Sequence, residues 1–505
     1  MLRYAGVVVA VALAAPGQSF NSPFKGYVFS PVYENATHPT PYVPLSFGGV
    51  LVDRGNPNSI LLGGNVAGAG GAFYSVPVGR DYTGNIAGLV SPGTQAIAAP
   101  RLGSGLAYGP PQQPGALLYS IESGSGGIDA GYVKAGAAGA SQTFSLVPES
   151  SSTLQFVPSF IGPDAGGQLK LLTRSGRFYE IPYTADANSF TPGTPSLVAT
   201  LPVSNVAGLA YVHRGSAGFT TDALLVAEVG GDRIVAYNID GNGNPLAASR
   251  RVFLTGLRGI SGMTVDPLTS DLIVSTRMNS TSGIYRIDGF SAGPPTVLSQ
   301  CSTNITGSGV FTLAGNLANT QTCLSFTNNV NVTLDCGGNT ISGGVLFNGV
   351  RVFRIRNCNL RHSGIHSVLT LIDSHYGEIV NNTIGDPGSS ERTQISMSDM
   401  LRVRVWENTI AVGWLVFEKS REIWLRKNNI TCTPDCVYLV ESRQGVMNAF
   451  DANVLDGRNV ASYGFLMRDE SNSYVEGNTI GRFTVDGIAL LGTNVFVNVY
   501  GNTVN

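Results

Sequence analysis

The sequence Val-Trp-Glu-Asn-Thr-Ile at residues 405–410 returns as Leu-Arg-Lys-Asn-Asn-Ile at 425–430, Val-Glu-Gly-Asn-Thr-Ile at 475–480 and Val-Tyr-Gly-Asn-Thr-Val at 499–504. Each copy has an apolar residue, two variable positions, an asparagine, one variable position and a second apolar residue. A repeat of this length indicates one supersecondary unit stacked on itself. Eight copies follow one another at intervals of 19 to 26 residues, and their asparagine position holds Asn339, Cys358, Asn382, Asn408, Asn428, Asn453, Asn478 and Asn502.

Apolar residues alternate around each asparagine, which predicts strands with one buried face. The positions three before and two after the asparagine are apolar in all eight copies. The position five before is apolar in most copies, but it is weaker at Gly377, Asn448 and Ser473. We expect these three columns to point into a solenoid. The asparagines then mark a bend between two strands, where their stacked side chains hydrogen-bond from coil to coil.

This repeat resembles the parallel β-helix of the pectin-lyase-like and NosD-like families, and residues 331–343 resemble an opening coil of such a domain. The resemblance covers residues 300–505. It implies a right-handed parallel β-helix that continues beyond this segment or stacks on another chain. It implies no single function, because the same fold carries lyases, hydrolases, adhesins and inert fibres.

Residues 20–295 contain a second, looser repeat of short apolar strands. Five groups of three or four strands follow one another at a step of about 48 to 56 residues, which is typical of β-propeller blades. The groups resemble the six-bladed lactonase-like and NHL-type propellers. We therefore expect six blades, with the sixth built from the N-terminal segment and closing near Thr296–Ser299. The five groups begin near Val50, Gly105, Leu154, Gly208 and Gly262, and the boundary between the domains is expected near residues 291–295.

The compartment is indicated by the start of the chain and by the cysteines. Residues 1–19 form a short, mostly apolar stretch with small residues at the expected cleavage site. This pattern predicts a secretory signal peptide, with a buried first strand as the alternative. All six cysteines follow residue 300, and an even number fits disulfides in a secreted protein. Cys336 lies in an inward column and Cys358 in the next asparagine position, so we pair them. Cys432 pairs with Cys436 across a short loop, and Cys301 with Cys323 by elimination.

Charge and sequence motifs limit the partners. Charged residues make up only 13% of the chain and its net charge is −2, so we expect neither a nucleic-acid partner nor a polybasic membrane face, and no transmembrane anchor in this segment. Asn-x-Ser/Thr sequons permit covalent glycans in a eukaryotic secretory route. The glycosylation candidates are Asn35, Asn279, Asn304, Asn331, Asn381 and Asn429.

The solenoid lacks the acidic clusters of polysaccharide-degrading enzymes. A lyase needs clustered acidic calcium ligands beside a base, and a hydrolase needs aspartates on adjacent coils. Here the outward acids are scattered, and cations and aromatic residues lie side by side instead. Such a face is covered by another part of the chain, contacts a second subunit, or stacks sugar rings. The candidates for this contact face are Arg354, Arg356, Arg404, Trp406, Trp424, Arg426, Tyr474 and Tyr500.

Two further groups of residues are candidate ion sites. His362, His366 and His375 lie close together near Asp373, but histidines on solenoid turns are more often simply exposed. Residues 240–244, Asp-Gly-Asn-Gly-Asn, resemble a calcium-loop fragment, yet Arg251 stands where such a loop needs its final acid, which favours a plain turn. No cysteine spacing fits zinc. We predict no cofactor, with calcium as the one open alternative.

Together these patterns predict an all-β protein with an N-terminal propeller and a C-terminal β-helix. We interpret it as a non-catalytic, extracellular structural glycoprotein, a subunit of a surface filament, flagellar hair, sheath or adhesive fibre that contacts copies of itself or other fibre subunits. The alternatives are an extracellular polysaccharide lyase or glycoside hydrolase and a carbohydrate-binding adhesion protein, for which polysaccharide is the partner.

Overall fold

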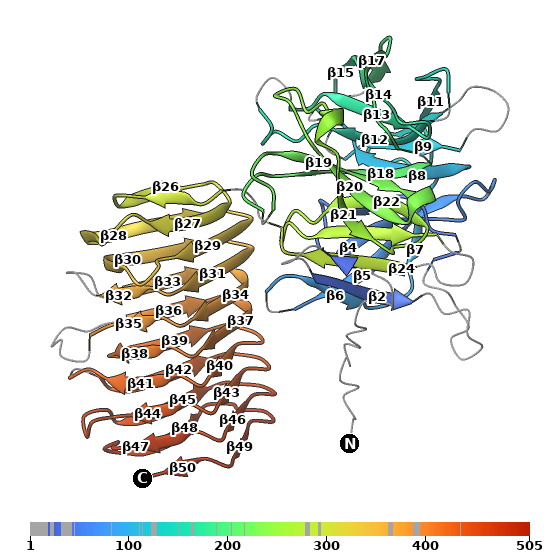
Figure 1. The fold of residues 1–505 in the computed structure, drawn as a ribbon. Helices are drawn as coiled ribbons and strands as arrows, with labels where there is room; N and C mark the ends of the chain where they lie inside the picture. The colour runs from blue at the N-terminus through green and yellow to red at the C-terminus, as the bar shows by residue number, and fades with distance from the viewer. Residues whose placement is uncertain are drawn as a thin grey trace. The chain divides into compact units, whose positions relative to one another are not determined.

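The computed structural model describes the whole chain except residues 1–18, 21–24, 32–42, 45, 82, 111, 114, 123–128, 150, 163–165, 188, 204, 217, 278–282, 291–293, 362–366, 387–393 and 435. The chain divides into two compact units (Figure 1), Met1–Arg80 with Ile86–Gly293 and Asp81–Asn85 with Pro294–Asn505. Both units are built from strands. In the described residues the helical segments are the short 3-10 turns η1 (Val229–Gly231) and η2 (Ala247–Ser249). The predicted signal peptide lies outside the described residues, apart from Ser19.

The first unit is a β-propeller with five blades (Figure 1). Each blade begins with an inner strand, and the inner strands contact one another in ring order, with the last lying against the first. They fall in the five groups of apolar residues that the sequence shows, so the propeller is confirmed. The inner strands are β3 (Val50–Val52), β8 (Leu102–Tyr108), β12 (Ser151–Phe156), β18 (Val206–Val212) and β22 (Ile260–Val265).

Antiparallel partners complete each blade. In blade one they are β4 (Ser59–Gly64), β5 (Ala72–Arg80), β6 (Ile86–Leu89) and β7 (Thr94–Ala98), and in blade two β9 (Leu117–Ile121), β10 (Ala130–Val133) and β11 (Gln142–Phe144). Blade three adds β13 (Leu169–Thr173), β14 (Arg177–Ile181) and β17 (Ser196–Thr200), with a separate hairpin of β15 (Tyr183–Ala185) and β16 (Phe190–Pro192). Blade four adds β19 (Ala223–Glu228), β20 (Arg233–Asn238) and β21 (Arg251–Thr255), and blade five adds β23 (Leu272–Thr276) and β24 (Gly283–Asp288).

The expectation of six blades is wrong. The N-terminal strands β1 (Ser19–Phe20) and β2 (Lys25–Pro31) do not start a blade but pair with the outer strands β21 and β24 of blades four and five. Thr296–Leu298, expected to close the sixth blade, form β25 of the second unit. The N-terminal strands pair with the backbone N–H and C=O groups at the outer edges of blades four and five. These edges are therefore covered, and the ring is complete without a further blade.

Buried polar contacts fasten blade five to blade one. Arg80, at the end of β5, forms an ion pair with Asp266 at 2.6 Å, and both side chains are inaccessible to water. The hydroxyl groups of Ser261 and Ser275 donate hydrogen bonds of 2.6 Å to the backbone oxygens of Phe47 and Gly48. A buried charge pair is tolerated only where its geometry and hydrogen bonds are good. These contacts therefore fix how the first and last blades meet.

The second unit is a parallel β-helix with three strand positions per coil (Figure 1). The first position forms one ten-stranded sheet of β25 (Thr296–Leu298), β27 (Gly309–Leu313), β29 (Asn331–Asp335), β31 (Val352–Arg356), β34 (His375–Val380), β37 (Leu401–Trp406), β40 (Trp424–Arg426), β43 (Ala449–Asp451), β46 (Tyr474–Glu476) and β49 (Asn498–Tyr500). The second position, after the asparagine bend, holds β32 (Asn359–Arg361), β35 (Thr383–Ile384), β38 (Thr409–Val412), β41 (Asn429–Cys432), β44 (Val454–Asp456), β47 (Thr479–Gly481) and β50 (Thr503–Val504). The third holds β33 (Ser367–Ile372), β36 (Gln394–Ser398), β39 (Trp414–Glu418), β42 (Tyr438–Arg443), β45 (Tyr463–Arg468) and β48 (Asp486–Leu491). In the first coils β28 (Leu317–Thr327) and β30 (Thr340–Asn348) run through both later positions, and β26 (Ser302–Ile305) pairs with β28.

The three predicted apolar columns form the core of the β-helix. From Leu334 to Ile480 their apolar members are almost completely buried. In the first coils a row of phenylalanine rings adds to the core, with Phe326 and Phe347 at 4.7 Å between ring centroids. Burial of apolar surface at about 25 cal/mol per Å² is the main stabilising contribution of such a column.

In the column five positions before the asparagine, three residues are not apolar, and each has a structural reason. A Cβ atom on Gly377 would lie 1.9 Å from Cζ of Phe353, so only glycine leaves room for that ring. Asn448 and Ser473 belong instead to a buried polar cluster around Glu470. Its carboxylate accepts hydrogen bonds from Ser442 at 2.6 Å and Ser473 at 2.8 Å, and burial raises the pKa of Glu470. A buried polar group is acceptable when it is hydrogen-bonded, so these positions need no apolar residue.

Asparagine side chains run through the bends as a ladder. The backbone N–H and the Nδ2 group of Asn382 both donate to Oδ1 of Asn408, at 2.9 and 3.0 Å. The same pair of bonds recurs in each following step to Asn428, Asn453, Asn478 and Asn502. Asn339 lies outside this ladder, because the next coil has Cys358 at that position, and its Nδ2 donates to the Cys336 carbonyl instead.

The residue before each ladder asparagine adopts the left-handed backbone conformation. Its φ is 51° at Lys427, 52° at Ala452 and 63° at Gly477. This conformation costs an ordinary L-residue about 1 kcal/mol or more. The ladder bonds on its C-terminal side therefore hold a tight bend that the local sequence alone does not favour.

Disulfides join neighbouring parts of the same unit. Cys301 is bonded to Cys323 and Cys336 to Cys358, each pair 22 residues apart and therefore about one coil apart. Cys432 is bonded to Cys436 within a loop. These are the pairs expected from the sequence.

Candidate functional site

The ten-stranded sheet carries charged and aromatic side chains on its outer surface from β31 to β49. We call this surface the Arg–Trp face. Its residues lie four and two positions before the bends, where the side chains of a strand alternate away from the core. The face consists of Arg354, Arg356, Glu378, Arg404, Trp406, Trp424, Arg426, Asp451, Tyr474, Glu476 and Tyr500.

Two arginines and two tryptophans form a checkerboard at its centre. In the register of β37 and β40, Arg404 lies beside Trp424, and Trp406 beside Arg426. The guanidinium of Arg404 is 5.4 Å from the Trp424 ring centroid and 5.5 Å from that of Trp406, while Arg426 is 5.4 Å from Trp424. Cations at this distance are attracted by the ring faces. These four side chains and Lys427 line a shallow depression of about 150 Å³.

The carboxylates of the face are held by neighbours within it. Glu378 accepts a hydrogen bond from the Trp406 indole at 3.1 Å and lies 3.8 Å from Arg404. Asp451 accepts one from the Trp424 indole at 2.8 Å and lies 3.2 Å from Arg426. These contacts lock the indole and guanidinium groups in place.

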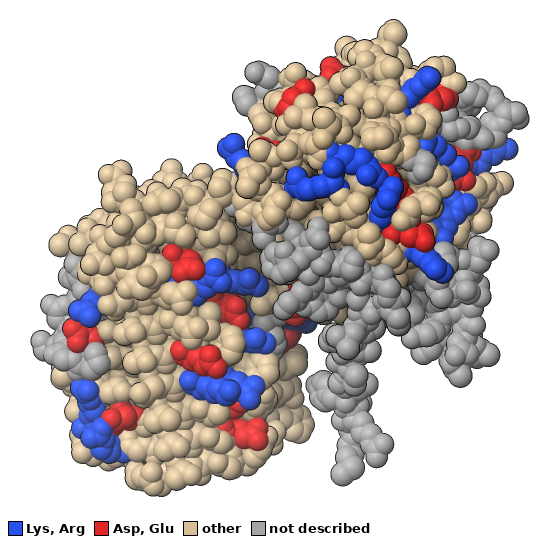
Figure 2. All heavy atoms as spheres, in the orientation of Figure 1, with Lys and Arg blue, Asp and Glu red and all other residues tan. Residues whose placement is uncertain are grey.

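Charge is unevenly distributed along this face. Its four arginines lie on β31, β37 and β40 with one carboxylate, Glu378 on β34, among them, whereas Asp451 and Glu476 lie on β43 and β46. The early coils of the face are therefore mainly basic and the later coils acidic. On the side of this unit seen in Figure 2, basic and acidic side chains are interleaved and no large area has one sign.

Sequence reasoning missed a second polar cluster on the third strand position. The side chain of Glu441 is fully buried, although it points away from the apolar core. It accepts hydrogen bonds from the Trp414 indole at 3.0 Å, from Arg443 at 2.7 Å and from Arg468 at 2.8 Å. The guanidinium of Arg443 also lies 5.2 Å from the Trp414 ring. A search for repeated Arg, Trp and Glu in the strands after the bend could have found this cluster.

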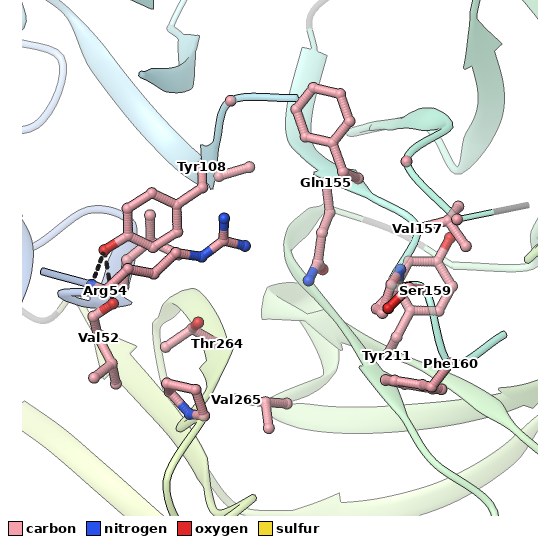
Figure 3. Close-up of a pocket in the computed structure, with 18 of the residues that line it drawn as sticks. Val52, Arg54, Tyr108, Gln155, Val157, Ser159, Phe160, Tyr211, Thr264 and Val265 are labelled. Carbon is pink, nitrogen blue, oxygen red and sulfur yellow. Dashed lines mark hydrogen bonds between the residues drawn. The ribbon is translucent and has the colours of Figure 1, made fainter. Parts of the chain in front are cut away.

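The propeller contains a pocket of about 620 Å³ where its inner strands end (Figure 3). All five blades contribute to it, through Val52, Tyr108, Phe156, Tyr211 and Val265 among others. The wall is mostly apolar and aromatic. Ligand pockets commonly have this size and composition, with a few polar groups that set orientation.

Three polar groups in this pocket lack partners among the described residues. Arg54 is exposed to solvent; its guanidinium stacks over the Tyr108 ring at 4.3 Å without an ion pair or hydrogen bond to a described residue, and partial desolvation lowers its pKa. Oε1 of Gln155 is buried without a hydrogen bond. The Thr264 hydroxyl is also without a described partner. Tyr108 is different, because its hydroxyl donates to Val52 O at 2.8 Å and accepts from Arg54 N–H, and burial raises its pKa to about 12.

Of the two candidate ion sites, the structure describes the 240–244 loop in full and the histidine group only in part. In the 240–244 loop, Asp240 Oδ1 accepts the backbone N–H groups of Asn242 and Asn244, at 2.9 and 2.8 Å, as in an ordinary Asx turn. His375 lies 3.4 Å from Asp373, whereas His362 and His366 lie outside the described residues. Among the described residues no group of three or more His, Cys, Asp or Glu side chains is arranged to hold a metal ion.

Four glycosylation candidates lie in the described residues. Asn304, Asn381 and Asn429 are exposed, and Asn331 is half-buried. Asn35 and Asn279 lie outside the described residues. In the part of the chain that the structure covers, no helix has the length and apolar character needed to cross a membrane.

A comparison with known protein families agrees with the fold of the second unit. Residues 343–505 match the family described as "Right handed beta helix region", which establishes the handedness of the solenoid. No curated protein sequence matches the chain.

Solved structures are similar to the chain over about half its length. A glucose dehydrogenase is 13% identical, with 48% of this chain and 81% of that chain covered and a TM-score of 0.31. The calcium-binding protein regucalcin from Agrobacterium tumefaciens is 13% identical, with 46% and 68% covered and a TM-score of 0.27. The PQQ domain of pyranose dehydrogenase from Coprinopsis cinerea is 11% identical, with 54% and 97% covered and a TM-score of 0.28.

Proposed function

We propose that this protein is a non-catalytic structural glycoprotein of the cell exterior, and that its β-helix is a rigid scaffold whose Arg–Trp face contacts a second copy of the chain. In this role it is a subunit of a surface filament, sheath or adhesive fibre. The observation that carries the proposal is the checkerboard of Arg404, Trp406, Trp424 and Arg426. Tryptophan and arginine contribute most strongly to protein interfaces, and here they are held in place before any partner arrives.

The charge distribution favours a copy of the same face as the partner. A two-fold axis between the coils of β40 and β43 would place the basic early coils of one face against the acidic later coils of the other. In this pairing β37 of one copy lies opposite β46 of the second copy, three coils further along, so that Arg404 is a diagonal neighbour of Glu476 across the interface. Two-fold dimers of this kind use one self-complementary patch on both subunits.

The extracellular location is supported by the disulfides and the sequons. Disulfides form and persist in oxidising compartments, and the three pairs tie the β-helix together within single coils or between neighbouring ones. The exposed Asn304, Asn381 and Asn429 are open to glycan attachment.

Sedimentation velocity of the full, disulfide-bonded chain tests this function. The wild type is expected to self-associate, and Trp424→Ala is expected to weaken association at least tenfold, because interface tryptophans often contribute more than about 2 kcal/mol. The matched control, Arg361→Glu, changes an exposed arginine on β32 and should leave association unchanged. A wild type that stays monomeric at high concentration contradicts the proposal.

Enzymatic activity provides the second outcome. Degradation of uronic-acid polysaccharides by the purified chain, lost on substitution of Glu378 or Asp451, would favour a lyase or hydrolase instead. Binding of such polysaccharides without cleavage, lost in Trp424→Ala, would favour a carbohydrate-binding adhesion protein. Both results would replace self-association as the role of the Arg–Trp face.

A further inference from the structure

We propose that the five-bladed propeller binds a small hydroxylated organic acid, of the size and chemistry of a sugar acid, in the pocket at the ends of its inner strands. This site is separate from the Arg–Trp face and does not depend on the function proposed for that face. It rests on the pocket itself and on the unpaired polar groups within it (Figure 3).

Arg54 supplies the charge recognition. Its guanidinium lines the pocket, is stacked on Tyr108, and has no carboxylate partner among the described residues. Arginine presents parallel N–H donors that match a carboxylate, and the stacked ring restricts its motion. The exposed guanidinium is therefore available to the carboxylate of an organic anion.

Gln155 and Thr264 supply the recognition of hydroxyl groups. Oε1 of Gln155 is buried and accepts no hydrogen bond from a described residue, although buried polar atoms are nearly always paired. Gln155 lines the pocket, so a rotation of its amide would bring this oxygen to a ligand hydroxyl that donates to it. Thr264 lines the same pocket on another blade and can donate or accept.

The remaining wall sets the shape of the ligand. Phe156, Val157, Phe160 and Val265 present apolar surface that can pack against the ring or carbon skeleton of a small molecule. Phe160 is 39% exposed and stacks on His213 at 4.6 Å, so one ring face is held in a fixed orientation. The volume of about 620 Å³ admits a monosaccharide or disaccharide acid and excludes a folded macromolecule.

Isothermal titration calorimetry of the full chain with glucuronate, galacturonate and gluconate tests the proposal, with glucose as the neutral comparison. At least one acid should bind at concentrations up to about 10 mM, and glucose should bind at least about tenfold more weakly, since a charge-assisted hydrogen bond contributes 1.5 to 3 kcal/mol. Arg54→Ala should weaken binding of the acid about tenfold or more, and Arg54→Lys should recover part of it.

Two further variants separate recognition from folding. Gln155→Met keeps the size of the side chain and removes the unpaired acceptor, so it should weaken glucuronate but leave unchanged a carboxylate without hydroxyl groups, such as cyclohexanecarboxylate. Arg258→Ala removes an exposed arginine just before the start of β22, at the opposite end of the inner strands, and should have no effect. The proposal is overturned if none of the three acids binds, if glucose binds as well as they do, or if Arg54→Ala leaves binding unchanged in a protein that melts like the wild type.

Discussion

Replacing one asparagine in the middle of the ladder should destabilise the β-helix strongly. Asn428 is the position of choice, because it is almost completely buried and is bonded to the coils on both sides. Asn428→Ala keeps the backbone and removes only the amide. Its effect should be compared with the same substitution at Asn502, at the partly exposed end of the ladder, and at Asn339, outside it.

The magnitude follows from the bonds that each amide makes. Oδ1 of Asn428 accepts the N–H and Nδ2 groups of Asn408 at 3.0 and 2.9 Å, and its Nδ2 donates to Val405 O, to Arg426 O and to Asn453 Oδ1 at 2.9 to 3.0 Å. The substitution leaves at least the Asn408 N–H and one backbone carbonyl buried without their partners. At about 1 to 3 kcal/mol for each unsatisfied group, we expect a loss of about 3 to 5 kcal/mol.

The two reference positions should cost much less. Among the described residues, Asn502 bonds to the preceding coil and to Tyr500 O of its own coil, and water can reach it, so Asn502→Ala should cost about 1 kcal/mol. The side chain of Asn339 makes a single bond, to Cys336 O, and is also partly exposed, so Asn339→Ala should cost less than about 1 kcal/mol.

Tryptophan fluorescence during guanidinium unfolding measures these differences in the full chain. All three tryptophans of the protein, Trp406, Trp414 and Trp424, belong to the β-helix, so the signal reports this unit and not the propeller. Hydrogen exchange of the peptide containing Asn408 provides an independent local measurement. If Asn428→Ala is no more destabilising than Asn339→Ala, the ladder does not hold the coils together and the reasoning fails.

Three further predictions concern the disulfides, the bends and the propeller. Replacing Cys336 and Cys358 together by alanine should lower the free energy of unfolding of the β-helix by about 3 kcal/mol, as expected for a loop of 22 residues, and an unchanged midpoint in guanidinium would contradict this. Ala452→Gly should stabilise the same unit by up to about 1 kcal/mol, because the left-handed backbone at φ 52° is strained for alanine; a lower midpoint would show that the bend is not strained. Asp129 accepts hydrogen bonds from Leu146 and Val147 N–H, yet burial raises its pKa to about 6. A carboxyl group with a raised pKa in the folded state contributes stability that is fully present below its unfolded pKa near 4 and is lost as the pH rises through about 6. Calorimetry should therefore show the propeller gaining stability from pH 7 to 4. The variant Asp129→Asn should remove this part of the pH dependence.

Much of the β-helix could be predicted because its signal is local and repeated. The spacing of Asn382, Asn408 and Asn428 places one bend above another, and the apolar columns follow from strand alternation. The polar positions in those columns could not be predicted. Gly377 depends on the Phe353 ring in the coil before it, and Asn448 depends on Glu470 in the coil after it.

In the propeller, the number of blades and the pocket could not be predicted from the sequence. Its inner strands are visible as apolar groups, but the number of blades depends on which edges the strands β1 and β2 join, and those pairings span most of the unit. The pocket is also hidden in the sequence, since Arg54, Gln155 and Thr264 come from three blades and only the closed ring brings them together. For the same reason a chemical role for Gln155 cannot be inferred from its neighbours in the chain.

The most direct test of the scaffold role is a charge-reversal cycle on the Arg–Trp face, followed by sedimentation velocity. Arg404→Glu alone and Glu476→Arg alone should each weaken self-association about tenfold, because each places like charges opposite one another across the two-fold axis. The double variant restores opposite charges between the two copies and should associate nearly as the wild type does. If the double variant is as weak as the two single changes combined, or if none of the three differs from the wild type, this face does not join two copies and the proposed role is contradicted.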